Sequence, residues 1–168
     1  MKNELLHHYF TMDPGWNTAT AYWKNPEIIN PIVNCIYVNK SLDTEGRLAD
    51  MWYKFEEELD RFSIVKFIVV ESTAYWEESL VSKTSHKRGD IHTLSFLIGG
   101  YLDIARIRGI PFMLLPSVKW KGNMDDQQVR RRVKYVSGVD YENSHICDAV
   151  GIGLSLQNKF NVRKRRIS

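Results

Sequence analysis

The sequence has few cysteines and no long apolar run, and these absences exclude several classes of protein. Its 168 residues include only Cys35 and Cys147, both in apolar segments without C-x-x-C or Cys/His finger spacing. Reduced, buried thiols are therefore expected, not a disulfide or a zinc site. No run approaches the roughly 18 apolar residues of a membrane span, and the start M-K-N-E-L-L-H-H lacks the apolar stretch of a secretory signal. We therefore expect no membrane partner and, by default, a cytoplasmic location.

Composition and charge indicate a folded chain with unevenly placed basic residues. Hydrophobic residues make up 43% and charged residues 26%, which is typical of a globular protein and excludes a mainly disordered one. The length suits a single domain over residues 1–160, followed by a basic tail over 161–168. The net charge is only +3, but basic residues crowd the segment 130–134 and the tail. Either run alone could be a solvated surface, whereas two such runs would favour a polyanionic partner if the chain also carries a phosphodiesterase site.

Hydrophobic periodicity predicts an α/β fold. A hairpin of two strands comes first, then a third strand and a helix, and later segments alternate helix and strand. The near-continuous apolar run 64–70 is typical of a strand buried on both faces of a sheet. The predicted strands are 5–12, 18–23, 31–38, 64–70 and 110–115, and the predicted helices are 45–62, 90–108, 125–136 and 144–156. Ser144 is the expected N-cap of the last helix. The expected architecture is a mixed sheet with an antiparallel hairpin and flanking helices.

Four polar side chains could converge on one pocket of this fold. Asp13 and Glu71 each close an apolar run that reads as a strand, and His145 and Asp148 are one helical turn apart. Each has a structural explanation: D-P-G is an ordinary turn, Glu71 could reach solvent, a histidine near a helix start is often a cap, and an i, i+3 pair such as His145 and Asp148 is common by chance. Taken together, carboxylates and an imidazole suit a hard cation such as Mg²⁺, which most often serves phosphodiester hydrolysis.

Five segments, taken in order, resemble the RuvC-type Holliday-junction resolvases of the ribonuclease H-like superfamily. They are D-P-G-x-x-T-A, I-V-V-E-S, G-G-Y-L-D-I-A-R-I-R-G-I-P, P-S-V-K-W-K with the later Q-Q-V-R-R-R-V, and S-H-I-C-D-A-V-G-I-G-L. The resemblance covers most of the chain and implies a ribonuclease H-like fold. It also implies two Mg²⁺ ions per active site, with Mn²⁺ as a substitute, and a location in a bacterial or virus-infected cell.

The resemblance assigns roles to individual residues. Asp13, Glu71, His145 and Asp148 would be both catalytic residues and metal ligands, and Lys119 would contact the DNA near the scissile phosphate. The last pair reads H-x-x-D where many members of the family have D-x-x-D.

DNA contacts are implied for a further set of residues. A second family lysine falls near Asp125 or Asp126, so Lys121 or Arg130 could replace it, and Arg131 belongs to the same basic helix. The family's aromatic wedge is matched only approximately, by Tyr75 and Trp76, which could stack on unpaired bases or cover the core.

The resemblance also implies a homodimer, because symmetric nicking of a four-way junction needs two identical sites. Gly99 and Gly100 could let helices of two subunits approach closely, or they could serve packing within one subunit. The expected function is Mg²⁺-dependent, structure-selective cleavage of branched DNA. The alternatives are another ribonuclease H-like nuclease cutting forks, flaps or hybrids, and a junction-binding scaffold without turnover.

Overall fold

A five-stranded mixed sheet forms the centre of the protein, with the strands in the order β3-β2-β1-β4-β5. This is a computed structural model, and it describes residues 7–72 and 90–160. The antiparallel pairs are β1 with β2 and β2 with β3, whereas β4 pairs in parallel with β1 and with β5. The strands are β1 (Tyr9–Asp13), β2 (Asn17–Trp23), β3 (Ile32–Tyr37), β4 (Phe67–Ser72) and β5 (Phe112–Pro116).

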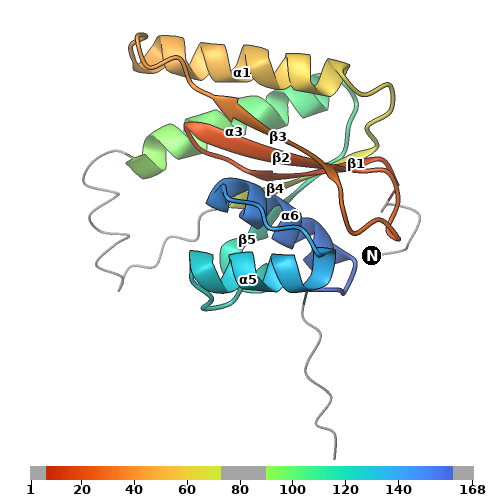
Figure 1. The fold of residues 1–168 in the computed structure, drawn as a ribbon. Helices are drawn as coiled ribbons and strands as arrows, with labels where there is room; N and C mark the ends of the chain where they lie inside the picture. The colour runs from red at the N-terminus through yellow and green to blue at the C-terminus, as the bar shows by residue number, and fades with distance from the viewer. Residues whose placement is uncertain (1–6, 73–89, 161–168) are drawn as a thin grey trace, which may run out of the picture.

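Helices cover both faces of the sheet (Figure 1). On one face lie α1 (Thr44–Asp60) and α3 (Asp90–Ile107), which pack against each other. On the other face α6 (Ser144–Leu156) lies against β1 and β2, and α5 (Asp126–Ser137) packs on α6. A four-residue helix, α4 (Ser117–Trp120), follows β5 directly. Among the described helices, none is both long and apolar enough to cross a membrane.

Side-chain alternation along the central strands divides the core between these two faces. Tyr9 of β1 and Val69 of β4 belong to the core under α6, while Phe10 and Val70 belong to the core under α1 and α3. All four side chains have no exposed surface, so β1 and β4 are buried on both faces. This matches the apolar run from which the sequence predicted a central strand.

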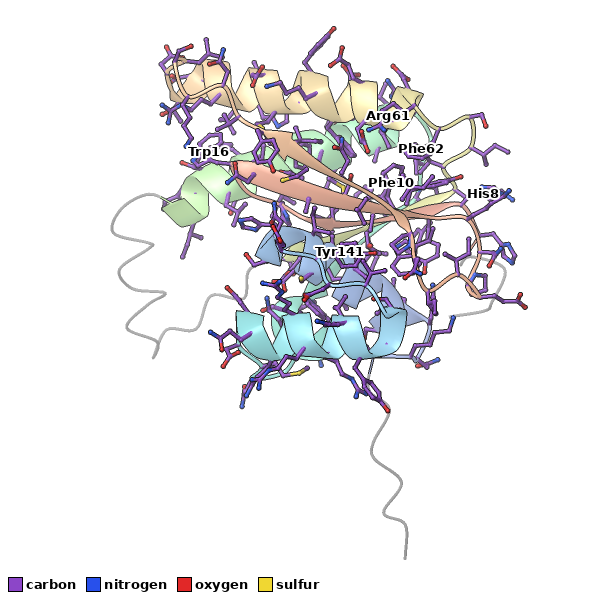
Figure 2. All side chains as sticks on the ribbon, viewed as in Figure 1. His8, Phe10, Trp16, Arg61, Phe62 and Tyr141 are labelled. Atoms are coloured by element: carbon purple, nitrogen blue, oxygen red, sulfur yellow. The ribbon has the colours of Figure 1, made fainter. Side chains whose placement is uncertain are left out.

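An aromatic group closes the α1 side of the sheet at the start of β1. The ring centroid of Phe62 lies 4.1 Å from that of Tyr22 and 5.1 Å from that of Phe10. Phe10 and Phe62 are labelled in Figure 2, where they lie at the end of the sheet marked by His8. These contacts hold the beginning of β1, and Asp13 lies at its other end.

The predicted elements match the observed order, with a few local differences. The strand expected over 5–12 begins at Tyr9. The strand expected over 64–70 begins at Phe67, and α4 was not expected. The predicted N-cap Ser144 is wrong, because the side chain of Asn143 accepts the hydrogen bond from the backbone N–H of His145. The N-cap of α5 is Asp125, which forms a capping box with Gln128.

Close approach to tryptophan rings requires glycine at positions of both α6 and α3. A Cβ at Gly153 of α6 would lie 2.2 Å from Trp23 of β2, and a Cβ at Gly100 of α3 would lie 2.0 Å from Trp52 of α1. Packing within one chain therefore accounts for Gly100. A Cβ at Gly99 would meet no heavy atom within 4 Å among the described residues, so the intrachain packing leaves Gly99 unexplained.

Candidate metal centre

The register of two parallel strands brings the first two acids together. The β1–β4 pairing runs from Tyr9 opposite Phe67 to Met12 opposite Val70, and the next residues are Asp13 and Glu71. Neighbouring strands lie about 4.8 Å apart, and side chains at equivalent positions point to the same face. For Asp13 and Glu71 this face is the one that α6 covers.

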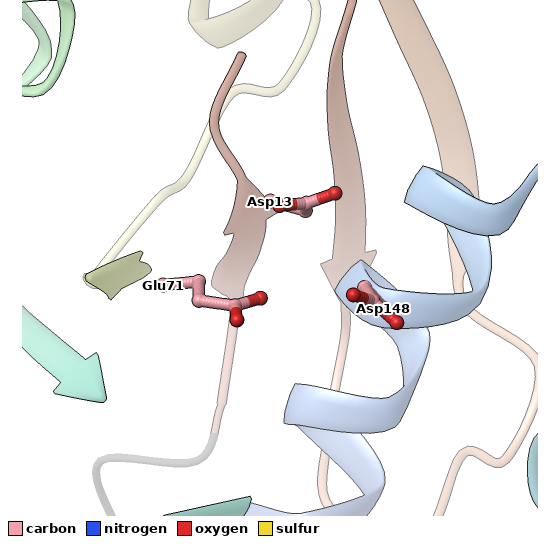
Figure 3. A group of neighbouring side chains, drawn as sticks. All are labelled: Asp13, Glu71 and Asp148. Atoms are coloured by element: carbon pink, nitrogen blue, oxygen red, sulfur yellow. The ribbon is translucent and has the colours of Figure 1, made fainter. Parts of the chain in front are cut away.

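The third acid comes from α6, which hydrogen bonds fix to the sheet. The hydroxyl of Thr11 donates to the backbone carbonyl of Ala149 at 2.6 Å, and the indole N–H of Trp23 donates to the Thr11 oxygen at 2.9 Å. Asp148 is the residue before Ala149 and therefore lies over the carboxyl end of β1. One oxygen from each of Asp13, Glu71 and Asp148 lies within 4.8 Å of the others. Figure 3 shows the three carboxylates reaching into one space from β1, β4 and α6.

Burial and mutual repulsion make this group unfavourable without a cation. Glu71 is 9% and Asp148 8% exposed, and Oε2 of Glu71 and Oδ1 of Asp148 have no hydrogen-bond partner among the described residues. Burial, reinforced by the charge of Asp13, raises the pKa of Glu71 to about 8. Burial also raises the pKa of Asp148 to about 6, although Lys121 acts against this shift. Buried carboxylates in this state attract positive charge.

The chemistry of the three acids fits a divalent metal ion. All the available ligand atoms are carboxylate oxygens, which suit hard cations such as Mg²⁺ and Mn²⁺. If such an ion bound, the two buried oxygens that lack a hydrogen-bond partner could coordinate it. A bound ion of this kind would activate water and stabilise a leaving oxygen in phosphoryl chemistry.

His145 lies beside the three acids and contacts one of them. Its Nδ1 lies 2.6 Å from Oδ2 of Asp13, and its side chain is 43% exposed. This hydrogen bond raises the pKa of His145, although partial burial opposes the change. The structure therefore brings all four predicted residues together, with His145 attached to the acids through Asp13.

Lys121 brings a positive charge to two of the three acids. Its Nζ contacts Oδ2 of Asp148 and lies 3.5 Å from Oε1 of Glu71. Burial lowers the pKa of Lys121, but the two carboxylates more than offset this, so the pKa is above its ordinary value. Sequence reasoning considered Lys121 only as a DNA contact and gave the position nearest the scissile phosphate to Lys119. Lys119 is exposed, and within the described residues it makes no contact with the acids.

The residues predicted to bind DNA are only partly described. Arg130 pairs with Asp140 at 2.8 Å, and Lys134 pairs with the other oxygen of Asp140 at 2.8 Å. These two cations lower the pKa of Asp140 to about 2. Arg131 is exposed on the outer side of α5. Tyr75, Trp76 and the basic tail over 161–168 lie outside the described residues.

The fold is ribonuclease H-like, with the sheet order and flanking helices of that class. It is similar to Thermus thermophilus RuvC in complex with a Holliday-junction substrate, with a TM-score of 0.67 and 16% identity, over 92% of this chain and 93% of that one. A second Thermus thermophilus RuvC structure gives a TM-score of 0.61 and 18% identity, over 90% and 93% of the two chains. The yeast mitochondrial Holliday-junction resolvase Ydc2 gives 0.58 and 14%, over 92% and 80%.

No protein-family model matches the chain, and no curated protein matches it either. At 14–18% identity the structural similarity establishes the fold, and the fold prediction is confirmed. The activity has to be argued from the site itself.

Proposed function

We propose that the protein is a metal-dependent, structure-selective endonuclease that resolves Holliday or other branched DNA junctions by paired phosphodiester hydrolysis. The observation that carries this proposal is the group of Asp13, Glu71 and Asp148, with ligand oxygens within 4.8 Å of one another at the edge of a ribonuclease H-like sheet. The similarity to a RuvC structure that holds a Holliday junction supports the choice of substrate.

The residues of this chain would divide the work between holding an ion and contacting DNA. Asp13, Glu71 and Asp148 would hold Mg²⁺ or Mn²⁺, which supplies an activated water and charge stabilisation when bound. His145 would orient Asp13 through their hydrogen bond and accept or release a proton at its exposed ring. Arg131 and Lys119, both exposed, would bind phosphates, with Arg130 joining if its pair with Asp140 opens. Tyr75 and Trp76 are proposed to contact unpaired bases on the grounds of sequence alone.

A panel of labelled substrates tests the proposal. The protein is incubated with a synthetic four-way junction, a replication fork and a linear duplex in the presence of Mg²⁺. We expect paired, symmetric nicks in the junction alone, and complete loss of cutting when EDTA removes the metal. Cutting of forks or duplex at a similar rate would favour a general ribonuclease H-like nuclease. Tight junction binding without cutting would leave a non-catalytic scaffold.

A homodimer is part of the proposal, because a four-way junction offers two equivalent strands to cut. The outer face of α3 exposes large apolar side chains, as expected of a surface that contacts a second copy of the chain. Phe96 and Ile107 are 66% and 70% exposed, and Gly99 and Asp103 share their helix face by spacing. A hollow of about 470 Å³ lies beside them, between α1 and α3, with Trp52 in its wall.

Phe96→Asp is therefore expected to shift the protein from dimer to monomer. An aspartate would place a charge in the apolar contact, where losing a central aromatic anchor costs about 2 kcal/mol or more. Light scattering during gel filtration measures the mass. Lys40→Asp, a charge change at an exposed position outside α3, is the control and should leave the mass unchanged. A variant that elutes like wild type would place the dimer contact elsewhere.

A further inference from the structure

Lys121 is held inside the metal centre and does not extend from the surface. Its side chain is only 18% exposed, and its ammonium group contacts one oxygen of Glu71 and one of Asp148. These are two of the three acids of the centre. The ammonium group of Lys121 therefore lies between Glu71 of β4 and Asp148 of α6.

The backbone around Lys121 is anchored so that the side chain stays in this place. The N–H of Lys121 donates to the carbonyl of Ser117 at 2.9 Å, which closes the single turn of α4. The preceding Trp120 is 1% exposed, and its ring lies against Phe160 with a centroid distance of 5.4 Å. A Cβ at Gly151 would lie 2.5 Å from that ring, so α6 has no side chain where Trp120 inserts. The ammonium of Lys121 also lies 5.0 Å from the centre of the Trp120 ring.

Some of the carboxylate oxygens already have a partner, and this limits which of them can bind an ion. Lys121 engages Oε1 of Glu71 and Oδ2 of Asp148, and His145 engages Oδ2 of Asp13. Among the buried carboxylate oxygens of the centre, Oε2 of Glu71 and Oδ1 of Asp148 have no hydrogen-bond partner within residues 7–72 and 90–160. Three carboxylates and one ammonium carry a net charge of −2 when all are ionised, which one divalent ion neutralises.

We propose that Lys121 takes the position of a second cation between Glu71 and Asp148, so that the centre binds one divalent ion instead of two. This inference rests on the proposed function, since it concerns the same metal centre. The ion would bind through Asp13 and the oxygens that Lys121 leaves free. The ammonium group supplies the second positive charge near the reacting phosphate, where it can bind an oxygen anion but cannot coordinate and activate a water as a metal does. The sequence had led us to expect two ions.

Titration of the full chain with Mn²⁺ in a calorimeter tests this proposal without DNA. Wild type is expected to bind one ion, and Lys121→Met is expected to bind two. Methionine keeps the apolar stem of the side chain but has no ammonium group, so Oε1 of Glu71 and Oδ2 of Asp148 become available to a second ion. Two Mn²⁺ ions about 3.5–4 Å apart, the spacing of two-metal sites, would also couple magnetically. Electron paramagnetic resonance should therefore show a coupled pair in Lys121→Met alone.

Lys119→Met is the matched control, since it removes the same charge from an exposed side chain two residues away. Among the described contacts, Lys121 pairs with the acids and Lys119 does not. Lys119→Met should bind one ion, as wild type does. If wild type binds two coupled ions, or if Lys121→Met binds only one, the assignment of Lys121 is overturned while the metal-dependent nuclease stands. If no form binds Mn²⁺, the metal centre of the proposed function fails, and the assignment of Lys121 fails with it. Circular dichroism at the titration temperature checks that each variant is folded.

Discussion

Glu71→Gln is expected to reduce metal-dependent junction cleavage by more than about 100-fold. Loss of groups that only support metal ligands typically costs 10–100-fold, and Glu71 is proposed to bind the ion directly. An amide keeps the shape of the side chain but lacks the negative charge that holds a divalent cation. Single-turnover cleavage of the labelled junction at saturating protein measures the loss, and filter binding in the absence of metal shows whether the variant still holds DNA.

The same substitution is expected to make the metal-free protein more stable. The carboxylate of Glu71 is buried near two other acids and leaves one oxygen unpartnered within the described structure. An amide carries no charge. Removing one buried, unpartnered charged group should raise the free energy of unfolding by on the order of 1–3 kcal/mol. For a chain of this size the melting temperature should rise by roughly 2–4 °C per kcal/mol.

The gain in stability should depend on pH in a defined direction. The pKa of Glu71 is raised from its ordinary value of 4.5 to about 8 in the folded protein. The folded state therefore keeps a proton that the unfolded chain has lost, and the stability from this difference disappears as pH rises from about 4.5 to about 8. Glutamine does not titrate, so its advantage over glutamate should grow from pH 5 to pH 8. Thermal melts in EDTA at these two pH values measure it.

Glu58→Gln provides a matched control with the opposite expected sign. Glu58 is also buried, at 4% exposure, but its carboxylate accepts hydrogen bonds from Arg61 at 2.6 Å and Asn34 at 2.8 Å. Replacing it removes charge-assisted bonds, and the melting temperature should fall. If the melting temperature of Glu71→Gln falls by the same amount, the buried carboxylate of Glu71 does not destabilise the metal-free protein.

Gly153→Ala is expected to destabilise the protein and to disturb the metal centre at the same time. The added Cβ would lie 2.2 Å from the ring of Trp23, which is fully buried and stacks on Tyr9. Overpacking of this kind costs about 1–3 kcal/mol, so the melting temperature should drop by several degrees, at roughly 2–4 °C per kcal/mol. If α6 moves away from the sheet to make room, Asp148 moves with it and the affinity for Mn²⁺ decreases.

Differential scanning calorimetry and Mn²⁺ titration measure the two effects of Gly153→Ala. Ser155→Ala is the control, because it changes a half-buried position of the same helix without adding atoms. It should change the free energy of unfolding by less than about 0.5 kcal/mol and leave the Mn²⁺ affinity unchanged. If Gly153→Ala proved as stable as wild type, the result would contradict the close contact between α6 and β2.

The order of elements was predictable because the decisive patterns are local. The apolar run before Glu71 is rich in β-branched residues, which favours a strand buried on both faces of a sheet, and the D-P-G sequence after Met12 favours the turn of a hairpin. Helix α4 was missed because its four residues are too few to show a period. The cap at Asn143 was misplaced by one residue, since asparagine and serine are both good N-caps and the sequence offers them side by side.

The candidate site was predictable in its members but not in its arrangement. Asp13 and Glu71 could be assigned to strand ends, and parallel strand ends meet at one edge of a sheet. That Lys121 would turn inward and Lys119 outward depends on Trp120 inserting beside Gly151, which is a contact between distant parts of the chain. Two lysines two residues apart carry no local signal that distinguishes them.

The wide separation of the three acids along the chain also affects when the protein can acquire metal affinity during its synthesis. Asp13 lies on β1, Glu71 on β4 and Asp148 on α6, the last described helix. A ribosome-bound chain that has not yet released α6 has at most the two strand acids, without the helix that covers them. Such a nascent chain has an incomplete site, so a nuclease built in this way would remain inactive towards nearby nucleic acid until α6 has emerged and packed on the sheet.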